Sequence, residues 1–245
     1  MTPVNTPASS AVRLPTPEAV LFDLDGTVVD TIPHILASFR HATADVLGEA
    51  LPDDVLLHYV GVPLARQMRY FTDDDEVAER LLASYRAFNH ATHDAMARLY
   101  PNSVATLETI AAAGIPMGIV TSKSRIMAMK AIELFGLGRF FKIVITADDT
   151  PSHKPDPLPI LHAAALLEVT PTAIVYVGDS PADVEAAKAA GASAVAATWG
   201  VADRVRLESA DPDAVIDDIA ELPALLGIGA SAPHVHADAG GTESA

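Results

Sequence analysis

The sequence predicts an α/β fold: a doubly wound parallel-sheet core with an inserted α-helical cap domain. A short apolar run at residues 19–22 ends in a pair of aspartates, which is typical of a buried parallel strand that opens into a loop. Residues 31–100 contain no strand-like run, whereas helices and short apolar strands alternate from residue 103 onward. Such alternation indicates parallel strands joined by right-handed crossovers, and hence a doubly wound sheet.

The cap domain is expected at residues 31–100 as a block of helices. Its first helix has apolar residues at helical spacing, Pro33 in its first turn and Gly48 just beyond its end. The helices expected in this block are residues 32–47, 52–60, 63–71 and a longer one marked by Leu81, Tyr85 and Phe88 that ends before Pro101.

The core domain is expected at residues 18–30 and 101–227. Its strands after the first are expected at residues 116–120, 141–145, 173–177, 194–197 and, at the edge, 213–216. Its helices are expected around Val104 to Ile110, at 126–135, 157–167 and 182–190, and before Leu226. The remaining segments, 1–17 and 228–245, lack periodicity and are expected to be a flexible N-terminus and a disordered tail.

The composition limits the classes of partner. Sixteen basic against 32 acidic residues give a net charge of −16, which argues against binding to nucleic acid or to an anionic membrane surface. It does not exclude a small anionic substrate, because a metal ion and a few lysines can reverse the field inside a cleft. The absence of cysteine excludes disulfides and thiolate metal sites. No run is apolar enough to span a bilayer and no targeting segment is evident, so we expect a cytoplasmic monomer or homodimer.

The first strand leads into the sequence DLDGT, residues 23–27. Alternation along a strand would place Asp23 and Asp25 on the same side, and their repulsion calls for a divalent cation or for one protonated carboxyl group. Gly26 permits a sharp turn whose backbone N–H groups can approach an anion. A polar strand end beside a turn would require neither the second aspartate nor Thr27, so this pattern indicates chemistry.

Further polar residues follow the later strands of the expected sheet. In an open parallel sheet, ligands bind beyond the carboxyl ends of the strands, so these side chains are expected to converge there. Each one alone is unremarkable, since a Thr-Ser pair is usually a helix cap and a loop lysine is usually solvated. The residues are Thr121, Ser122, Lys123, Lys154, Asp179 and Asp183.

These motifs together resemble the haloacid dehalogenase superfamily, over residues 20–200. The matching segments are DLDGT, TSK at residues 121–123, HKPDP around Lys154 and GDSPAD at residues 178–183. Within the superfamily, the segment TADDTPSHKPDPLPIL and the helical insertion after the first motif are similar to the branch of phosphoglycolate phosphatases and cytoplasmic pyrophosphatases.

The resemblance implies a Mg²⁺-dependent phosphatase that acts on a small phosphorylated metabolite. Asp23 would form an aspartyl phosphate, and Asp25 would serve as acid and then as base. The substrate and its phosphoryl group would be bound by Thr121, Ser122 and Lys154 together with Gly26 and Thr27 of the turn. Mg²⁺ would be held by the Asp23 side chain, the Asp25 carbonyl and Asp179, with Asp183 more remote. Dehalogenases lack the second aspartate, so its presence favours phosphoryl transfer.

The sequence is also compatible with different functions. A sugar phosphomutase has the same fold and both carboxylates, and a signalling receiver or a non-catalytic phosphate-binding protein belongs to another class. Arg66 and Arg69 are candidates to bind a second anionic group of the substrate, although exposed helical arginines are commoner. His90, His93 and Asp94 have the spacing of metal ligands, but a solvated helix face is the expected interpretation. His234 and His236 match no site.

Overall fold

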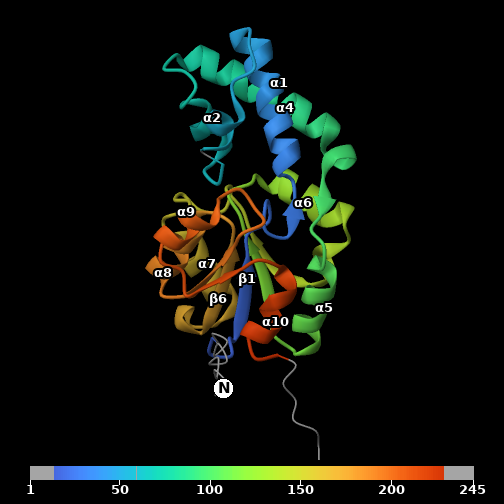
Figure 1. The fold of residues 1–245 in the computed structure, drawn as a ribbon, viewed down its shortest axis with the longest axis vertical. Coiled ribbons are helices and arrows are strands. Elements are labelled where there is room, and N and C mark those ends of the chain that lie inside the picture. The colour runs from blue at the N-terminus through green and yellow to red at the C-terminus, as the bar shows by residue number, and fades with distance from the viewer. Residues whose placement is uncertain (1–13, 59, 229–245) are drawn as a thin grey trace, which may run out of the picture.

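The computed structural model describes residues 14–58 and 60–228. A body built on a parallel sheet carries a separate group of helices above one edge of the sheet (Figure 1). Of the segments expected to be unstructured, residues 1–13 and 229–245 lie outside the described residues, and so do His234 and His236. The described part of the first segment has contacts, because the N–H of Leu14 donates to the carbonyl of Leu225 at 3.1 Å.

Six strands form the sheet, and every pair of neighbours is parallel. The central strand β1 (Ala19–Phe22) is fully buried, which explains its unbroken apolar sequence. The chain passes from β1 to β4 on one side and later to β6 on the other, so β1 lies at the topological switch point. The order is β5 (Phe141–Ile145), β4 (Met117–Val120), β1, β6 (Ile174–Gly178), β7 (Ser193–Ala197) and β8 (Ala214–Ile216).

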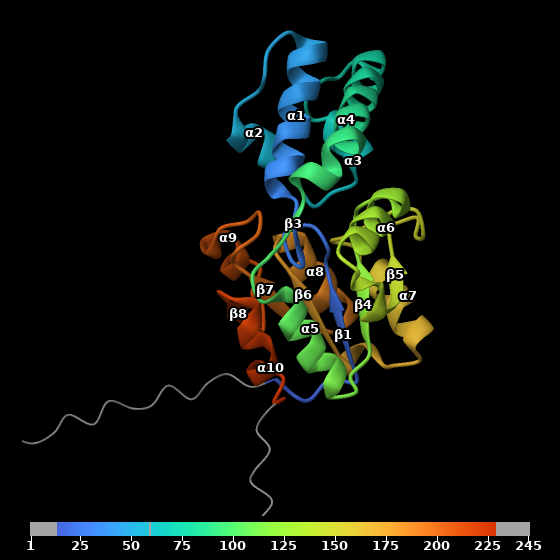
Figure 2. The same cartoon turned by 90° about the vertical axis from the view of Figure 1, so that its right-hand side faces the viewer.

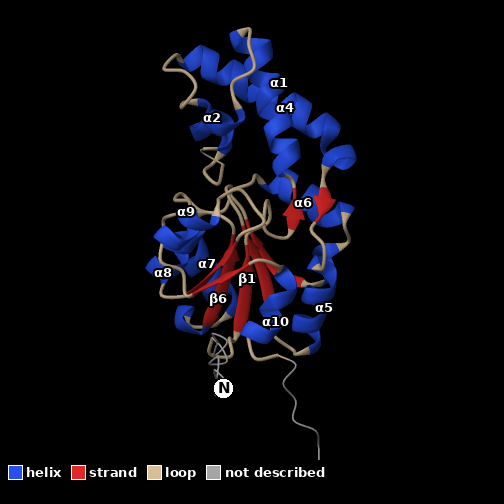
Figure 3. Cartoon of the chain, viewed as in Figure 1, coloured by secondary structure: helices blue, strands red, loops and turns tan. Residues whose placement is uncertain are grey.

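Helices cover both faces of the sheet, as Figure 3 shows. One face packs against α5 (Ser103–Ala112), α6 (Arg125–Leu134) and α10 (Leu222–Leu225). The other face packs against α7 (Leu158–Leu167), α8 (Pro181–Ala190) and α9 (Arg204–Ser209). The predicted α/β, doubly wound fold class with a helical insertion is therefore confirmed.

The helices after β1 form a body with a core of its own. They are α1 (Ile32–Leu47), α2 (Asp53–Leu57), α3 (Leu64–Met68) and α4 (Asp75–Met96), and we refer to them as the cap. Phe39 and Leu81 are fully buried in its centre, and the ring of Phe39 lies 4.7 Å from that of Tyr85. No helix among the described residues is long and apolar enough to cross a membrane.

The two chain crossings between sheet and cap differ from the prediction. No strand was expected between residues 31 and 100, yet β3 (Arg98–Leu99) pairs antiparallel with β2 (Val29–Asp30). The label β3 in Figure 2 lies at this junction between the two bodies. A two-residue strand has no periodicity, so the pattern could not reveal it. Also unexpected were α9 and the 3-10 turns η1 (Leu137–Arg139), η2 (Pro171–Ala173) and η3 (Ile219–Glu221).

Candidate active site

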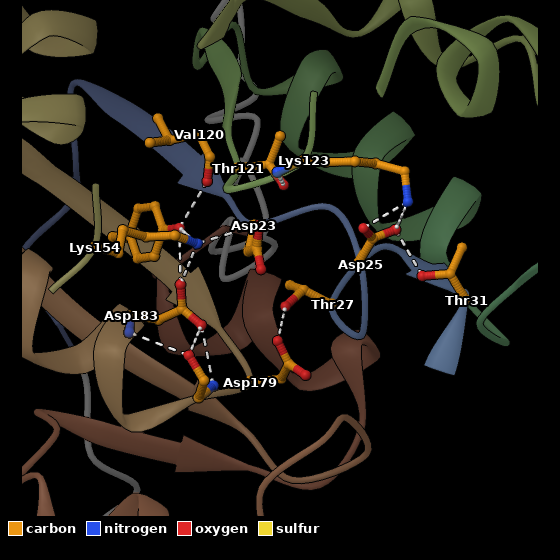
Figure 4. Close-up of polar contacts among 12 residues, drawn as sticks. Asp23, Asp25, Thr27, Thr31, Val120, Thr121, Lys123, Lys154, Asp179 and Asp183 are labelled. Atoms are coloured by element: carbon orange, nitrogen blue, oxygen red, sulfur yellow. Dashed lines mark hydrogen bonds and ion pairs between the residues drawn. The ribbon is translucent and has the colours of Figure 1, made fainter. Parts of the chain in front are cut away.

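The polar residues expected at the strand ends converge at the carboxyl edge of the sheet. Figure 4 shows them arriving from different strands, with Asp23 following β1, Thr121 following β4 and Asp179 following β6. A cavity of about 290 Å³ lies between this edge and the cap. Its lining includes Asp23, Asp25, Thr121, Ser122, Lys123 and Asp179 from the core, and Gln67, Arg86, Asn89 and His90 from the cap.

Three buried aspartates form the acidic centre of the site. Carboxylate oxygens of Asp23, Asp179 and Asp183 lie within 4.8 Å of one another. The ammonium group of Lys154, itself buried, lies 3.2 Å from Asp23 Oδ1 and 2.5 Å from Asp183 Oδ1. One lysine thus faces three carboxylates, and the cluster keeps an excess of negative charge away from bulk water.

Asp183 is held by hydrogen bonds on both of its oxygens. It is the third residue of α8, where it forms a capping box with Ser180, whose N–H and hydroxyl both donate to Asp183 Oδ2. The second oxygen accepts from Lys154 and lies 3.1 Å from the hydroxyl oxygen of Tyr176, which directs its proton to the carbonyl of Val120. Asp183 therefore orients Lys154 beneath Asp23 and has less capacity left to bind a cation directly.

Asp179 is fixed by the loops beside it. Thr27 donates to one carboxylate oxygen at 3.2 Å, and the N–H of Val201 donates to the other at 2.7 Å. The backbone approaches closely on both sides: a Cβ atom on Gly26 or on Gly200 would lie 2.1–2.2 Å from atoms of the Asp179 side chain. Glycine is required at both positions so that this carboxylate fits.

Gly26 and Thr27, predicted to bind the substrate, have partners within the protein. The N–H of Gly26 donates to the carbonyl of Val29 at 2.9 Å, so this particular N–H is not free to approach an anion. Gly26 does adopt the expected turn, with φ +80°. The buried hydroxyl of Thr27 is used by Asp179. Both residues therefore lie against the Asp179 side chain, one by close backbone approach and the other by a hydrogen bond.

Asp25 also differs from the prediction. Strand β1 ends at Phe22, so the alternation that would align Asp25 with Asp23 does not extend to it. Its carboxylate instead accepts from Lys123 Nζ at 2.7 and 2.9 Å and from the hydroxyl of Thr31 at 2.6 Å. Figure 4 shows Asp25 turned toward these two partners. Asp25 still lines the same cavity as Asp23, so both can face one ligand.

Thr121 and Ser122 lie in the loop after β4. The N–H of Thr121 continues the sheet by donating to Ile145, and its hydroxyl accepts weakly from the N–H of Lys123 at 3.3 Å. Ser122 Oγ is buried and has no hydrogen-bond partner among the described residues. Two hydroxyl groups are thus available at the cavity wall to an anionic ligand.

The carboxyl groups have perturbed proton affinities. Burial raises the pKa of Asp23 from 3.8 to about 6; Asp183 and Asp25 act in the same direction, and Lys154 opposes them. Burial also raises the pKa of Asp179 well above its usual range, with Asp183 and Asp23 adding to it. For Lys154 burial lowers the pKa, but Asp183 and Asp23 outweigh it and the net shift is upward. The cluster therefore favours added positive charge.

These residues fit a divalent cation with oxygen ligands. The donors are carboxylate oxygens, which such cations prefer. Asp23 Oδ1 is buried and has no hydrogen-bond partner within residues 14–58 and 60–228, although Lys154 lies 3.2 Å away as an ion pair. Asp179 and Asp23 are the best placed to contribute ligands, since both oxygens of Asp183 are already occupied.

The cap arginines considered as anion-binding candidates lie outside the cavity, in agreement with the commoner interpretation of exposed helical arginines. Arg66 and Arg69 do not line the cavity, and Arg69 is paired with Asp75. His90 does line it. His93, expected on a solvated face, is fully buried, and its ring lies 5.7 Å from that of His34 on α1. The face of α4 turned toward α1 is set by packing, which spacing alone does not reveal.

Two contributors to the site were not anticipated. Tyr176 lies inside the apolar run of β6, which predicts a core residue, yet its hydroxyl contacts Lys154 at 2.9 Å and donates to the carbonyl of Val120 at 2.8 Å. Val201 contributes only its backbone N–H, for which no side-chain signal exists. A tyrosine in an otherwise aliphatic strand that ends at Gly178 was the available clue.

Comparisons with known proteins agree with this architecture. A family model described as haloacid dehalogenase-like hydrolase matches residues 20–197. Pyrophosphatase PpaX of Anoxybacillus flavithermus is 35% identical over 209 residues, which cover 85% of this chain and 96% of that protein. Phosphoglycolate phosphatase of Neisseria meningitidis is 35% identical over 216 residues, 84% of this chain and 92% of that protein. A haloacid dehalogenase-like hydrolase structure from Streptococcus pneumoniae superimposes with a TM-score of 0.75 at 26% identity, over 84% and 96% of the two chains.

Proposed function

Because the chain belongs to the haloacid dehalogenase-like hydrolase family, we propose that it is a Mg²⁺-dependent phosphatase of small phosphorylated metabolites. The observation that carries the proposal is the buried cluster in which Lys154 faces Asp23, Asp179 and Asp183 beside a cavity of metabolite size. A nucleophile, a cation site and a phosphate-binding lysine would then meet at one point.

In the first step, an oxygen of Asp23 attacks the phosphorus atom and the bond from phosphorus to the leaving-group oxygen breaks. Asp25 donates a proton to that oxygen, and an aspartyl phosphate remains on Asp23. Thr31 and Lys123 hold the Asp25 carboxyl group at the cavity wall, where it can reach the leaving group.

In the second step, Asp25 takes a proton from a water molecule whose oxygen attacks the phosphorus. The bond between phosphorus and the Asp23 oxygen breaks, which releases inorganic phosphate and restores both carboxyl groups. Lys154, the N–H of Ser122 and the hydroxyl of Thr121 bind the phosphoryl oxygens, on which charge is concentrated during transfer.

Mg²⁺ would be held by the carboxylates of Asp23 and Asp179 together with the carbonyl of Asp25, and when bound it would neutralise charge on the phosphoryl group. This chain's residues prepare the site: Thr27 and Val201 orient Asp179, while Ser180 fixes Asp183 next to Lys154.

For the substrate, we propose a phosphoglycolate-like monoester or pyrophosphate, the compounds in the names of the two relatives. A sugar phosphomutase would use the same carboxylates but would move a phosphoryl group within a sugar phosphate without releasing phosphate. A signalling receiver or a non-catalytic phosphate-binding protein would show no turnover of any of these compounds.

The test measures phosphate release from a panel of phosphorylated metabolites, with Mg²⁺ and with excess chelator. We expect release only with Mg²⁺, and loss of turnover in the nearly isosteric variant Asp23→Asn. Asp54→Asn, at an exposed position on α2, is the matched control and should behave like wild type. Near-normal turnover of Asp23→Asn would place the nucleophile elsewhere, and full activity in chelator would refute the metal assignment.

A further inference from the structure

Arg86 is a cation on the cap wall of the cavity whose charge is not compensated. It lies on α4 and lines the cavity that also contains Asp23 and Asp25. Among the described residues, no carboxylate forms an ion pair or hydrogen bond with its guanidinium group. The chain has a net charge of −16 and twice as many acidic as basic groups, so most cations have carboxylates to pair with. An arginine in the cavity wall without such a partner is therefore a candidate to bind an anionic ligand.

The two lysines of the site are already paired. Lys123 contacts Asp25 at 2.7 Å, and Lys154 contacts Asp183 and Asp23. A phosphoryl group at Asp23 would therefore meet Lys154 first and would leave Arg86 available. The cavity extends from the core to α4, so a ligand bound at Asp23 can reach the cap side.

Three further cap arginines, in contrast to Arg86, do not line the cavity. Arg40 and Arg69 are paired with Asp53 and Asp75, respectively. Arg80 lies six residues earlier on α4 and is exposed, as Arg86 is, but unlike Arg86 it does not line the cavity. Arg86 thus combines two properties that these arginines lack together: a place in the cavity wall and an unused guanidinium group.

We propose that Arg86 binds a second anionic group of the substrate, a carboxylate or a phosphoryl group, while the reacting phosphoryl group lies at Asp23. This inference rests on the proposed function and deepens it by naming the residue that would select substrates with a second anionic group. The planar guanidinium group suits both carboxylate and phosphoryl oxygens, because it can donate two parallel hydrogen bonds. A cavity of about 290 Å³ admits a ligand of this size.

The experiment compares wild type, Arg86→Gln and the matched control Arg80→Gln on four substrates with Mg²⁺. Pyrophosphate and phosphoglycolate carry a second anionic group; methyl phosphate and p-nitrophenyl phosphate do not. We expect Arg86→Gln to lower the ratio of kcat/KM for the first pair to that for the second by roughly 10- to 100-fold, the range of a charge-assisted hydrogen bond. The loss should lie mainly in KM, and Arg86→Lys should recover part of it.

The two anionic substrates separate the two possible groups. A loss confined to phosphoglycolate identifies a carboxylate site, and a loss confined to pyrophosphate identifies a phosphoryl site; both support the inference. An unchanged ratio in Arg86→Gln, an equal change in Arg80→Gln, or a wild type with no preference for the first pair would overturn it. Wild type that releases phosphate from none of the four would instead refute the proposed function.

Discussion

Replacement of Lys154 by methionine should destabilise the protein strongly, and by an amount that depends on pH. The lysine is almost fully buried and lies 3.2 Å from Asp23 Oδ1 and 2.5 Å from Asp183 Oδ1. At an effective dielectric constant of about 20, two unit charges 3.2 Å apart attract by about 5 kcal/mol. Dehydration of the ammonium group offsets part of this attraction, so we expect a net loss of about 3 to 5 kcal/mol at pH 8.

The free energy of unfolding that Lys154→Met loses relative to wild type should become smaller as the pH falls. Without Lys154 the pKa of Asp23, already raised to about 6 by burial and by Asp183, would rise further. The folded variant would then bind more protons than its unfolded chain over the range from about pH 4 upward. Because the folded state holds these protons, the free energy of unfolding of the variant falls as pH rises.

The assay is urea unfolding at pH 5 and pH 8, in chelator so that no bound cation replaces the lysine. Lys142→Met, at an exposed position on β5, is the control and should change the free energy of unfolding by less than about 0.5 kcal/mol. Equal stability of Lys154→Met and wild type at pH 8 would refute the reasoning. An identical loss at both pH values would show that the three carboxylates do not respond as a charged cluster.

Two more predictions concern Asp25 and the cap. With p-nitrophenyl phosphate, whose leaving group needs no proton, Asp25→Ala should give a burst of nitrophenolate near one per site and then slow turnover. With an alkyl phosphate, the same variant should give no burst. A slow first turnover with both esters would contradict the role assigned to Asp25. Burial, helped by Lys123, lowers the pKa of His34 from 6.5 to about 4, so the unfolded chain binds the proton first as pH falls. Wild type should therefore lose on the order of 3 kcal/mol of unfolding free energy between pH 7 and pH 4 through His34. In His34→Gln, the free energy of unfolding should fall less between pH 7 and pH 4 than in wild type. If the free energies of unfolding of the two proteins change with pH in parallel, His34 is not the source of the loss.

Much of the fold and the place of the site follow from the sequence because the relevant signals are local. Apolar strands that alternate with helices determine the parallel pairing, and parallel strands place their carboxyl ends at one edge. For this reason Asp23, Thr121 and Asp179 could be expected to meet on the basis of the sequence alone. The predicted strand at residues 19–22 and helix at 32–47 match β1 and α1 residue for residue.

Only the tertiary structure decided which partner each side chain has. Gly26 and Thr27 lie against Asp179, and Asp25 turns to Lys123 and Thr31, because the chain leaves the extended conformation once β1 ends. Arg86, rather than Arg66 or Arg69, lines the cavity because the rotation of a cap helix about its axis depends on the packing of that helix against its neighbours. The positions of the strands and their parallel pairing follow from a local pattern, whereas the order of the strands and the contacts between distant helices and loops are fixed only when the whole chain packs.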